Sequence, residues 1–232
     1  MKITWLGQTG LLLDNGKVKI IIDPYLSDSV EKVNPQNFRR APVNKSFFDI
    51  TPDVMIFTHD HLDHYDPETA EVFLKKQDKK ITVLSPSSVW NKARLLGGGH
   101  NYVQFNRHTE WTEYGIRFSA VKAEHSDPLA IGVIIEDLSE QKKYYVTGDT
   151  LYNAEIFSDI PDDLFAIFLP INGVGNNMNA TDAERFAKRC GAKHAVPLHF
   201  GMFDEIDPNV FKCENKIVPS LWEEIKFNLR GV

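Results

Sequence analysis

Short apolar runs separated by turn-forming residues recur along the chain and predict β-strands. These runs lie near residues 2–6, 10–13, 18–23, 54–58, 81–84, 102–105, 116–122, 130–136, 143–147, 165–169 and 194–197. Segments with apolar residues at helical spacing predict helices near residues 67–76, 87–95, 181–190 and 219–227. Strands in two groups, with helices between and after them, indicate an α/β or layered α+β protein.

The ends of two of these helices carry recognisable signals. Thr181 followed by Glu184 has the spacing of a capping box, and Gly191 supplies a stop for the same helix. Asp66 precedes Pro67, which places proline at the favoured first position of the helix that begins there.

The composition is that of a globular protein that folds as one domain, residues 1–232, with 42% hydrophobic and 25% charged residues. A net charge of −6 argues against nucleic acid as the main partner. No segment approaches the roughly 20 apolar residues of a membrane span. The opening MKITWLG lacks the charged and apolar regions of a signal peptide, so we expect a cytoplasmic protein. A homo-oligomer is compatible with these features.

The segment THDHLDHYD, residues 58–66, concentrates side chains that bind metals, and it follows a strand-like apolar run. Its histidines and aspartate provide the imidazole and carboxylate groups of hydrolytic divalent-metal centres. Four such side chains, more than one tetrahedral ion with an open position needs, predict two adjacent ions. They are His59, His61, Asp63 and His64. The alternative is a polar loop that happens to be rich in histidine.

Three later strand-like runs also end at a residue that can bind metal: His125, Asp149 and His199. Each of these alone is more simply explained as a packed polar group. Because strand ends are where a rigid scaffold positions functional loops, their recurrence together with the first motif favours a shared metal site.

This order of histidines and aspartates resembles the metallo-β-lactamase superfamily. Ile22-Asp23-Pro24 is similar to its early strand that ends in a structural aspartate. The chain looks most like the branch that holds ascorbate-6-phosphate lactonase and N-acylphosphatidylethanolamine phospholipase D. The supporting stretches are residues 4–13, 21–28, 148–152 and 195–203. Gln8 departs from the pattern, because the phospholipase-like relatives usually have histidine there.

The resemblance implies a four-layer αββα sandwich, in which helices flank two packed mixed β-sheets, and a pair of divalent ions, zinc or manganese. A bridging hydroxide would be the nucleophile. Asp63 and Asp149 would act in catalysis, Asp63 by helping to accept a proton. Asp23 would orient a ligand histidine from behind. The implied ligands are His59, His61 and His125 for one ion, Asp63, His64 and His199 for the other, and Asp149 between them.

Two groups of residues are candidates for substrate binding. Arg39 and Arg40 lie in a long irregular segment, residues 26–49, and arginine holds phosphate well through its planar fork. The alternative for them is a solvated charged loop. Near the expected mouth of the site lie Tyr152, Asn179 and Phe200, which are as often ordinary packing residues.

These features together indicate a binuclear metal-dependent hydrolase of a small molecule. The resemblance favours a lactone or ester substrate, with a phosphorylated sugar acid as one option. The enzymatic alternative is a phosphodiesterase of the phospholipase D type. A metal-binding module without turnover is a third option, which the presence of the complete ligand set disfavours.

Overall fold

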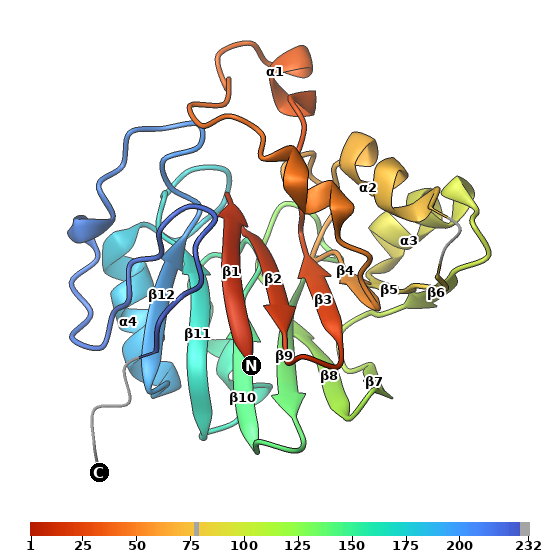
Figure 1. Ribbon diagram of the computed structural model, residues 1–232. Coiled ribbons are helices and arrows are strands. Elements are labelled where there is room, and N and C mark those ends of the chain that lie inside the picture. Colours follow the sequence, from red (N-terminus) through yellow and green to blue (C-terminus); the bar gives the residue numbers. More distant parts are fainter. Residues whose placement is uncertain (77–78, 228–232) are drawn as a thin grey trace.

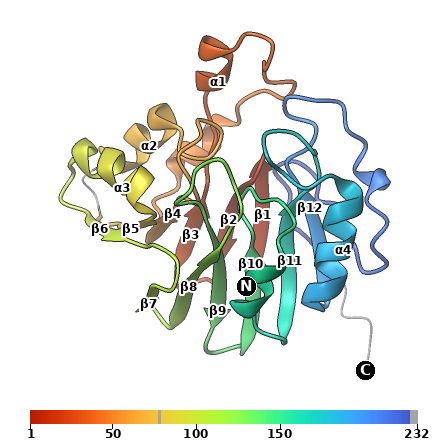
Figure 2. The ribbon, with the colours of Figure 1, turned by 180° about the vertical axis from the view of Figure 1, so that it is seen from behind.

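The computed structural model describes residues 1–76 and 79–227. Two six-stranded sheets pack face to face, and helices cover their outer faces (Figures 1 and 2). This arrangement confirms the predicted four-layer sandwich of two mixed sheets.

The first sheet has the strand order β1-β2-β3-β4-β5-β6. Its first two pairings are antiparallel and the others are parallel. Its strands are β1 (Lys2–Gly7), β2 (Gly10–Asp14), β3 (Lys19–Ile22), β4 (Val54–Ile56), β5 (Thr82–Ser85) and β6 (Asn101–Gln104).

The second sheet has the order β12-β11-β10-β9-β8-β7, antiparallel from β7 to β10 and parallel from β10 to β12. Its strands are β7 (Glu110–Glu113), β8 (Ile116–Lys122), β9 (Ile131–Asp137), β10 (Lys142–Val146), β11 (Leu164–Pro170) and β12 (His194–Leu198). The sequence pattern did not predict β7, an edge strand in which exposed Glu110 and Thr112 alternate with half-buried Trp111 and Glu113.

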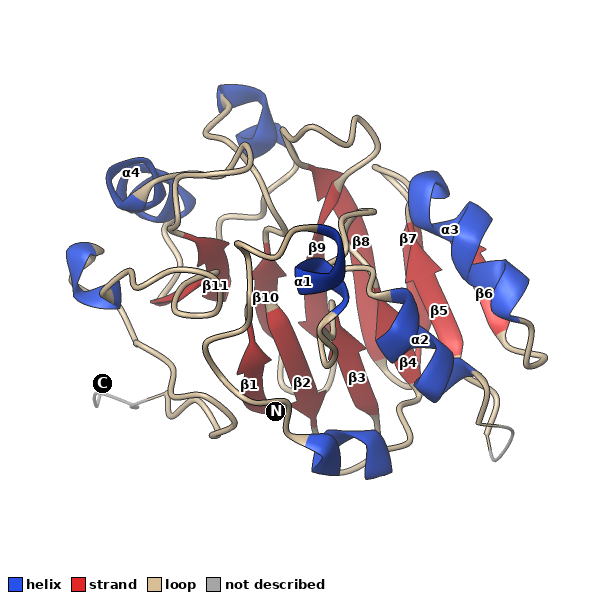
Figure 3. Ribbon diagram, turned by 90° about the horizontal axis from the view of Figure 1, so that it is seen from above, coloured by secondary structure: helices blue, strands red, loops and turns tan. Residues whose placement is uncertain are grey.

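The helices are short and lie outside the sheets (Figure 3). Phe73 of α2 and Val89 of α3 pack against Met55 and Val83 of the first sheet. Phe186 of α4 belongs to the larger core, which fills the space between the sheets. The α-helices are α1 (Ser29–Val33), α2 (Pro67–Leu74), α3 (Ser87–Ala93) and α4 (Ala180–Cys190), and the 3-10 helices are η1 (Lys45–Asp49), η2 (Arg94–Leu96), η3 (Ala154–Ser158) and η4 (Pro208–Val210). In the described part of the chain, no helix is long and apolar enough to cross a membrane.

The predicted helix at residues 219–227 is wrong. This segment contains turns and a single bridge from Glu224 to Thr4. Its backbone instead bonds to the open edge of β1: Ile225 N donates to Ile3 O at 2.7 Å, and Trp222 N donates to Trp5 O at 2.8 Å. Unpaired strand edges have a strong demand for hydrogen bonds, and this demand overrides the helical spacing of the apolar residues.

The start of α4 also differs from its prediction. The residue that caps this helix is Asn179, whose side chain accepts a hydrogen bond from Asp182 N at 2.9 Å. Thr181 therefore lies inside the first turn. The other two signals are confirmed, because Gly191 ends α4 with φ of 65° and Asp66 caps α2 with proline at its start.

Candidate metal centre

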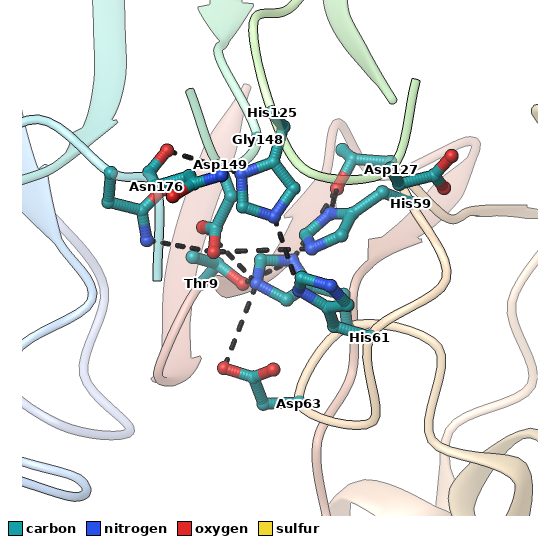
Figure 4. Close-up of polar contacts among 12 residues, drawn as sticks. Thr9, His59, His61, Asp63, His125, Asp127, Gly148, Asp149 and Asn176 are labelled. Atoms are coloured by element: carbon teal, nitrogen blue, oxygen red, sulfur yellow. Dashed lines mark hydrogen bonds and ion pairs between the residues drawn. The ribbon is translucent and has the colours of Figure 1, made fainter. Parts of the chain in front are cut away.

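All seven predicted metal ligands lie at the carboxyl-terminal ends of strands. His59, His61, Asp63 and His64 occupy the loop between β4 and α2, and His125 follows β8. Asp149 follows β10, and His199 follows β12. Because these four strands all run toward the same edge of the sandwich, the loops meet there (Figure 4).

The seven side chains form two groups. One contains His59, His61, His125 and Asp149, and the other contains Asp63, His64 and His199; within each group the ligand atoms lie within 4.8 Å of one another. Asp149 adjoins both groups, since its Oδ1 lies 3.2 Å from His64 Nε2 and its Oδ2 lies 3.3 Å from His199 Nε2. The structure thus brings a cluster of three histidines and a cluster of two histidines and one aspartate together around the Asp149 carboxylate.

The buried polar atoms of this site test whether divalent ions fit it. His59 Nε2, His64 Nε2 and Asp149 Oδ1 are shielded from solvent and have no hydrogen-bond partner among the described residues. A buried polar atom without a partner costs about 1–3 kcal/mol. Imidazole nitrogens and carboxylate oxygens are ligands of zinc and manganese, so the donor set fits such ions.

The electrostatics of the cluster also favour bound cations. Burial raises the pKa values of Asp63 and Asp149, but the neighbouring His64 and His199 outweigh burial and hold both pKa values well below the ordinary range. Burial conversely lowers the pKa of His199, but Asp149 and Asp63 raise it to about 10. Without metal, the histidines must therefore carry protons to balance the carboxylates. Divalent ions would supply that positive charge instead.

His59 differs from His64 and His199. Burial, reinforced by the proximity of His64, lowers the pKa of His59 well below 6.5. It is therefore neutral at pH 7, which is the form that binds a metal.

Asp23 lies behind the cluster and is fully buried. Its Oδ2 accepts hydrogen bonds from His64 Nδ1 at 2.8 Å and from Thr58 Oγ1 at 2.5 Å, and its Oδ1 accepts from Thr58 N at 2.8 Å. These contacts fix the proton of His64 on Nδ1 and leave Nε2 free for a metal, as the resemblance implied for this aspartate.

Two residues near the centre were not predicted to contribute. Gln8 Nε2 donates to Asp63 Oδ2 at 2.8 Å and lies 3.1 Å from the ring nitrogens of His199. Asn177 Nδ2 donates to Asp149 Oδ2 at 2.8 Å. The only sequence signals were the unusual glutamine after the first strand and the turn-rich run at residues 173–179, neither of which shows what the side chains contact.

The two arginines of the irregular segment lie outside the centre. Arg39 is almost fully buried, and its guanidinium donates to the carbonyls of Tyr25 at 2.9 Å, Ser27 at 3.4 Å and Ala41 at 3.3 Å. Arg40 donates to the Phe203 carbonyl. Arg39 therefore fastens its own segment through these carbonyls, while its buried Nη2 has no hydrogen-bond partner among the described residues. The predicted contact of the two arginines with an anion stays a prediction.

The other three predicted substrate residues are engaged elsewhere. Asn179 caps α4, as described above. Tyr152 packs on α4, with its ring 6.0 Å from that of Phe186. Phe200 is buried against Trp5, with ring centroids 5.0 Å apart. Packing and capping thus account for these three side chains.

A cavity of about 440 Å³ opens beside the centre. Four of the predicted ligands, His61, Asp63, Asp149 and His199, line it. The rest of its wall includes Val30, Asn37, Asn172, Val174, Phe203 and Asp204. The irregular segment therefore reaches the site through Val30 and Asn37.

Residues 19–200 match the beta-lactamase superfamily domain. The chain belongs to this superfamily. Among its relatives, a UPF0173 protein of Pyrococcus furiosus is 27% identical over 216 residues, which cover 92% of this chain and 90% of the relative. A UPF0173 metal-dependent hydrolase of Oenococcus oeni is 29% identical over 246 residues, which cover 91% of both proteins. The family predicted from the order of the histidines is thereby confirmed.

Solved structures share the fold over nearly the whole chain. Igni18, a metallo hydrolase from Ignicoccus hospitalis, has a TM-score of 0.75 and 21% identity, covering 98% of both chains. An isothiocyanate hydrolase from Delia radicum gut bacteria has a TM-score of 0.74 and 18% identity, covering 98% of this chain and 99% of the other. At these identities the comparison supports the sandwich architecture alone.

Proposed function

We propose that this protein is a binuclear metal-dependent hydrolase that opens a lactone or an ester of a small molecule. The observation that carries the proposal is the pair of ligand groups that share Asp149, with buried His59 Nε2, His64 Nε2 and Asp149 Oδ1 lacking hydrogen-bond partners in the described chain. The names of full-length relatives, such as the metal-dependent hydrolase of Oenococcus oeni, support the same class of activity.

His59, His61 and His125 would hold one ion, Asp63, His64 and His199 the other, and Asp149 both. Zinc or manganese held by these residues would supply Lewis acidity and would lower the pKa of a coordinated water toward neutrality.

The protein side chains orient and prepare this chemistry. Gln8 holds Asp63 Oδ2, which fixes the Asp63 carboxylate at the cavity wall, where it can accept a proton from the attacking water. Asn177 holds Asp149 Oδ2, and Asp23 holds the imidazole of His64. Because these partners are buried, the ligands keep their geometry before substrate enters.

The test compares metal content and turnover in the same preparations. Protein reconstituted with zinc or manganese is assayed on a lactone panel and on a phosphodiester panel, and bound metal is counted by mass spectrometry. We expect two ions per chain and lactone opening. Asp149→Asn should lose at least one ion and lower turnover by about a hundredfold or more, because it removes the shared ligand.

Asp162→Asn is the matched control, because Asp162 is exposed and distant from the ligand groups in the described chain. It should keep both ions and full turnover. Cleavage confined to the phosphodiester panel would replace the lactonase assignment with a phosphodiesterase. Two bound ions without turnover of either panel would count against both and favour a binding module.

A further inference from the structure

The cavity beside the metal centre has a distinctive charge distribution. No lysine or arginine is among the described residues that line it. Arg39 donates to backbone carbonyls outside the lining, and Arg40 donates to the backbone carbonyl of Phe203, which is part of the wall. Beyond the metal ligands, its polar wall consists of the amides Asn37, Asn172 and Asn177 and a carboxylate. Away from the metal ligands, this wall offers amide oxygens and a carboxylate as acceptors, and the carboxylate repels an anion placed beside it.

The carboxylate is Asp204. Its Oδ1 accepts hydrogen bonds from Gly201 N at 2.9 Å and from Ile206 N at 3.0 Å, so the loop holds the side chain in one orientation. Its Oδ2 has no hydrogen-bond partner in the described part of the chain. Because Asp204 lines the cavity, a fixed, negatively charged acceptor lies at its wall.

Two of the amides at the wall have buried oxygens without a hydrogen-bond donor. Asn172 and Asn177 are only 8% and 4% exposed, and the Oδ1 atom of each lacks a donor among the described residues. The orientation of the Asn177 amide is set by its Nδ2, which donates to Asp149, so its Oδ1 remains an acceptor. Buried acceptors without a donor are costly, and a donor from a bound molecule would relieve that cost.

The cavity wall also has an apolar side. Val174 is 64% exposed although it lines the cavity, and Gly173 and Gly175 flank it with φ of 68° and 67°. Val30 and Phe203 lie on the same wall. An exposed valine presented by a glycine-flanked turn is suited to contact an apolar part of a ligand.

We propose that this cavity selects substrates whose non-reacting end carries hydrogen-bond donors, a hydroxyl or an ammonium group, and rejects a phosphate or carboxylate there. Asp204, Asn172 and Asn177 would accept those hydrogen bonds, and Val174 would contact the intervening carbon chain. The inference rests on the proposed hydrolase function and specifies its substrate class. It disfavours a phosphorylated sugar acid whose phosphate lies away from the metal ligands, because that anion would face Asp204 on a part of the wall without lysine or arginine among the described residues.

Binding measurements test this selection separately from turnover. Three hydroxamates of equal chain length, ending in an ammonium, a hydroxyl or a carboxylate, are titrated into the zinc-loaded protein by calorimetry. The hydroxamate group anchors each ligand at the metal centre, so the other end samples the cavity. We expect the ammonium ligand to bind at least as tightly as the hydroxyl ligand, and the carboxylate ligand about tenfold more weakly than either.

Asp204→Asn removes the charge but keeps an oxygen for the Gly201 and Ile206 amides. It should reduce the preference for ammonium over carboxylate by about tenfold. Asp207→Asn is the matched control: Asp207 lies in the same loop and accepts from Asn209 N at 2.9 Å, but it does not line the cavity. This control should leave the preference unchanged.

Three results would overturn the inference. They are a carboxylate ligand that binds as tightly as the hydroxyl ligand, an unchanged preference in Asp204→Asn, and an equal loss in Asp207→Asn, which would assign the effect to the overall charge of −6. If the proposed function is wrong, the result is different: without a metal centre, none of the three hydroxamates would bind. In that case the inference would be wrong as well.

Discussion

Asp23 accepts a hydrogen bond from Nδ1 of His64 at 2.8 Å, and this contact leaves Nε2 of His64 facing Asp149, 3.2 Å from Oδ1. Both residues of the pair are fully buried. The aspartate thus determines which nitrogen of the imidazole is available to a metal, although it lies on a different strand end from the motif that contains His64.

Asp23→Asn should therefore weaken metal binding with little loss of fold. An amide at this position can keep one contact with Thr58 but no longer matches both the imidazole and the threonine donors. We expect metal affinity to fall by about 10–100-fold, the usual effect of removing such a partner. Competition with a metal chelator measures it. Asp14→Asn, which changes a turn contact to Gly16 N at 2.7 Å, is the control and should leave affinity unchanged.

Gln8 offers a second prediction. Gln8→Leu removes the donor to Asp63 Oδ2 but retains a side chain of similar size. We expect the rate to fall by about tenfold, since the loss of a partner that orients a metal-binding carboxylate has effects of 10–100-fold. The affinity for the ion held by Asp63, His64 and His199 should fall more than the affinity for the ion held by the other ligand group. Steady-state rates and metal content check both, with Gln104→Leu on the exposed face of β6 as the control. Unchanged rates would assign Gln8 to packing alone.

The sequence predicted which side chains gather at this site because that information is local. His59, His61, Asp63 and His64 fall within one short loop, and each later ligand ends an apolar strand run. Parallel strands then force these ends to one edge of the sandwich, so the residues that share a pattern also share a place.

The partners of the ligands and the cavity wall could not be predicted in the same way. Gln8 reaches Asp63 across the first sheet, and Asn177 reaches Asp149 from a loop that follows β11. Arg39 shows a similar limit: its charge suggested a contact with an anion, and the sequence did not indicate that its Nε and Nη1 donate to backbone carbonyls of its own segment. Such contacts depend on how distant loops fold over the edge, which neither spacing nor residue type records.

Removal of metal should make the stability of the protein depend on pH. In the metal-free protein, burial lowers the pKa of His199 but Asp149 and Asp63 raise it from 6.5 to about 10. A folded-state pKa above the unfolded one gives stability that is complete below pH 6.5 and is lost as pH rises toward 10. His199 alone should lower the free energy of unfolding by at most about 1.4 kcal/mol per pH unit in this window. Burial lowers the pKa of His64 as well, but Asp149 and Asp63 raise it well above its ordinary value, so His64 adds to the slope.

Denaturant titrations of chelator-treated and metal-loaded protein between pH 6 and 10 measure this slope. Bound ions replace the protons of the histidines, so the loaded protein should be more stable and less dependent on pH in this range. His199→Gln should flatten the slope of the metal-free protein. Equal slopes for the metal-free wild type and variant would show that His199 does not carry the effect.

Asp159, which lies outside the metal centre, should give the stability the opposite dependence on pH, in the acid range. Hydrogen bonds from Arg107, Nε at 2.7 Å and Nη2 at 3.0 Å, outweigh burial and lower the pKa of Asp159. Its stabilising contribution is therefore present above the unfolded pKa, near 3.8, and is lost as pH falls below it. Asp159→Asn should cost about 1–3 kcal/mol at pH 7, the range for hydrogen bonds to a charged group. Urea titrations should show this difference beginning to shrink only below pH 3.8, because the folded-state pKa lies well below that value. Asp162→Asn should match the wild type throughout. A difference that stays constant from pH 7 down to the lowest pH at which the protein folds would mean that packing, rather than charge, sets the loss.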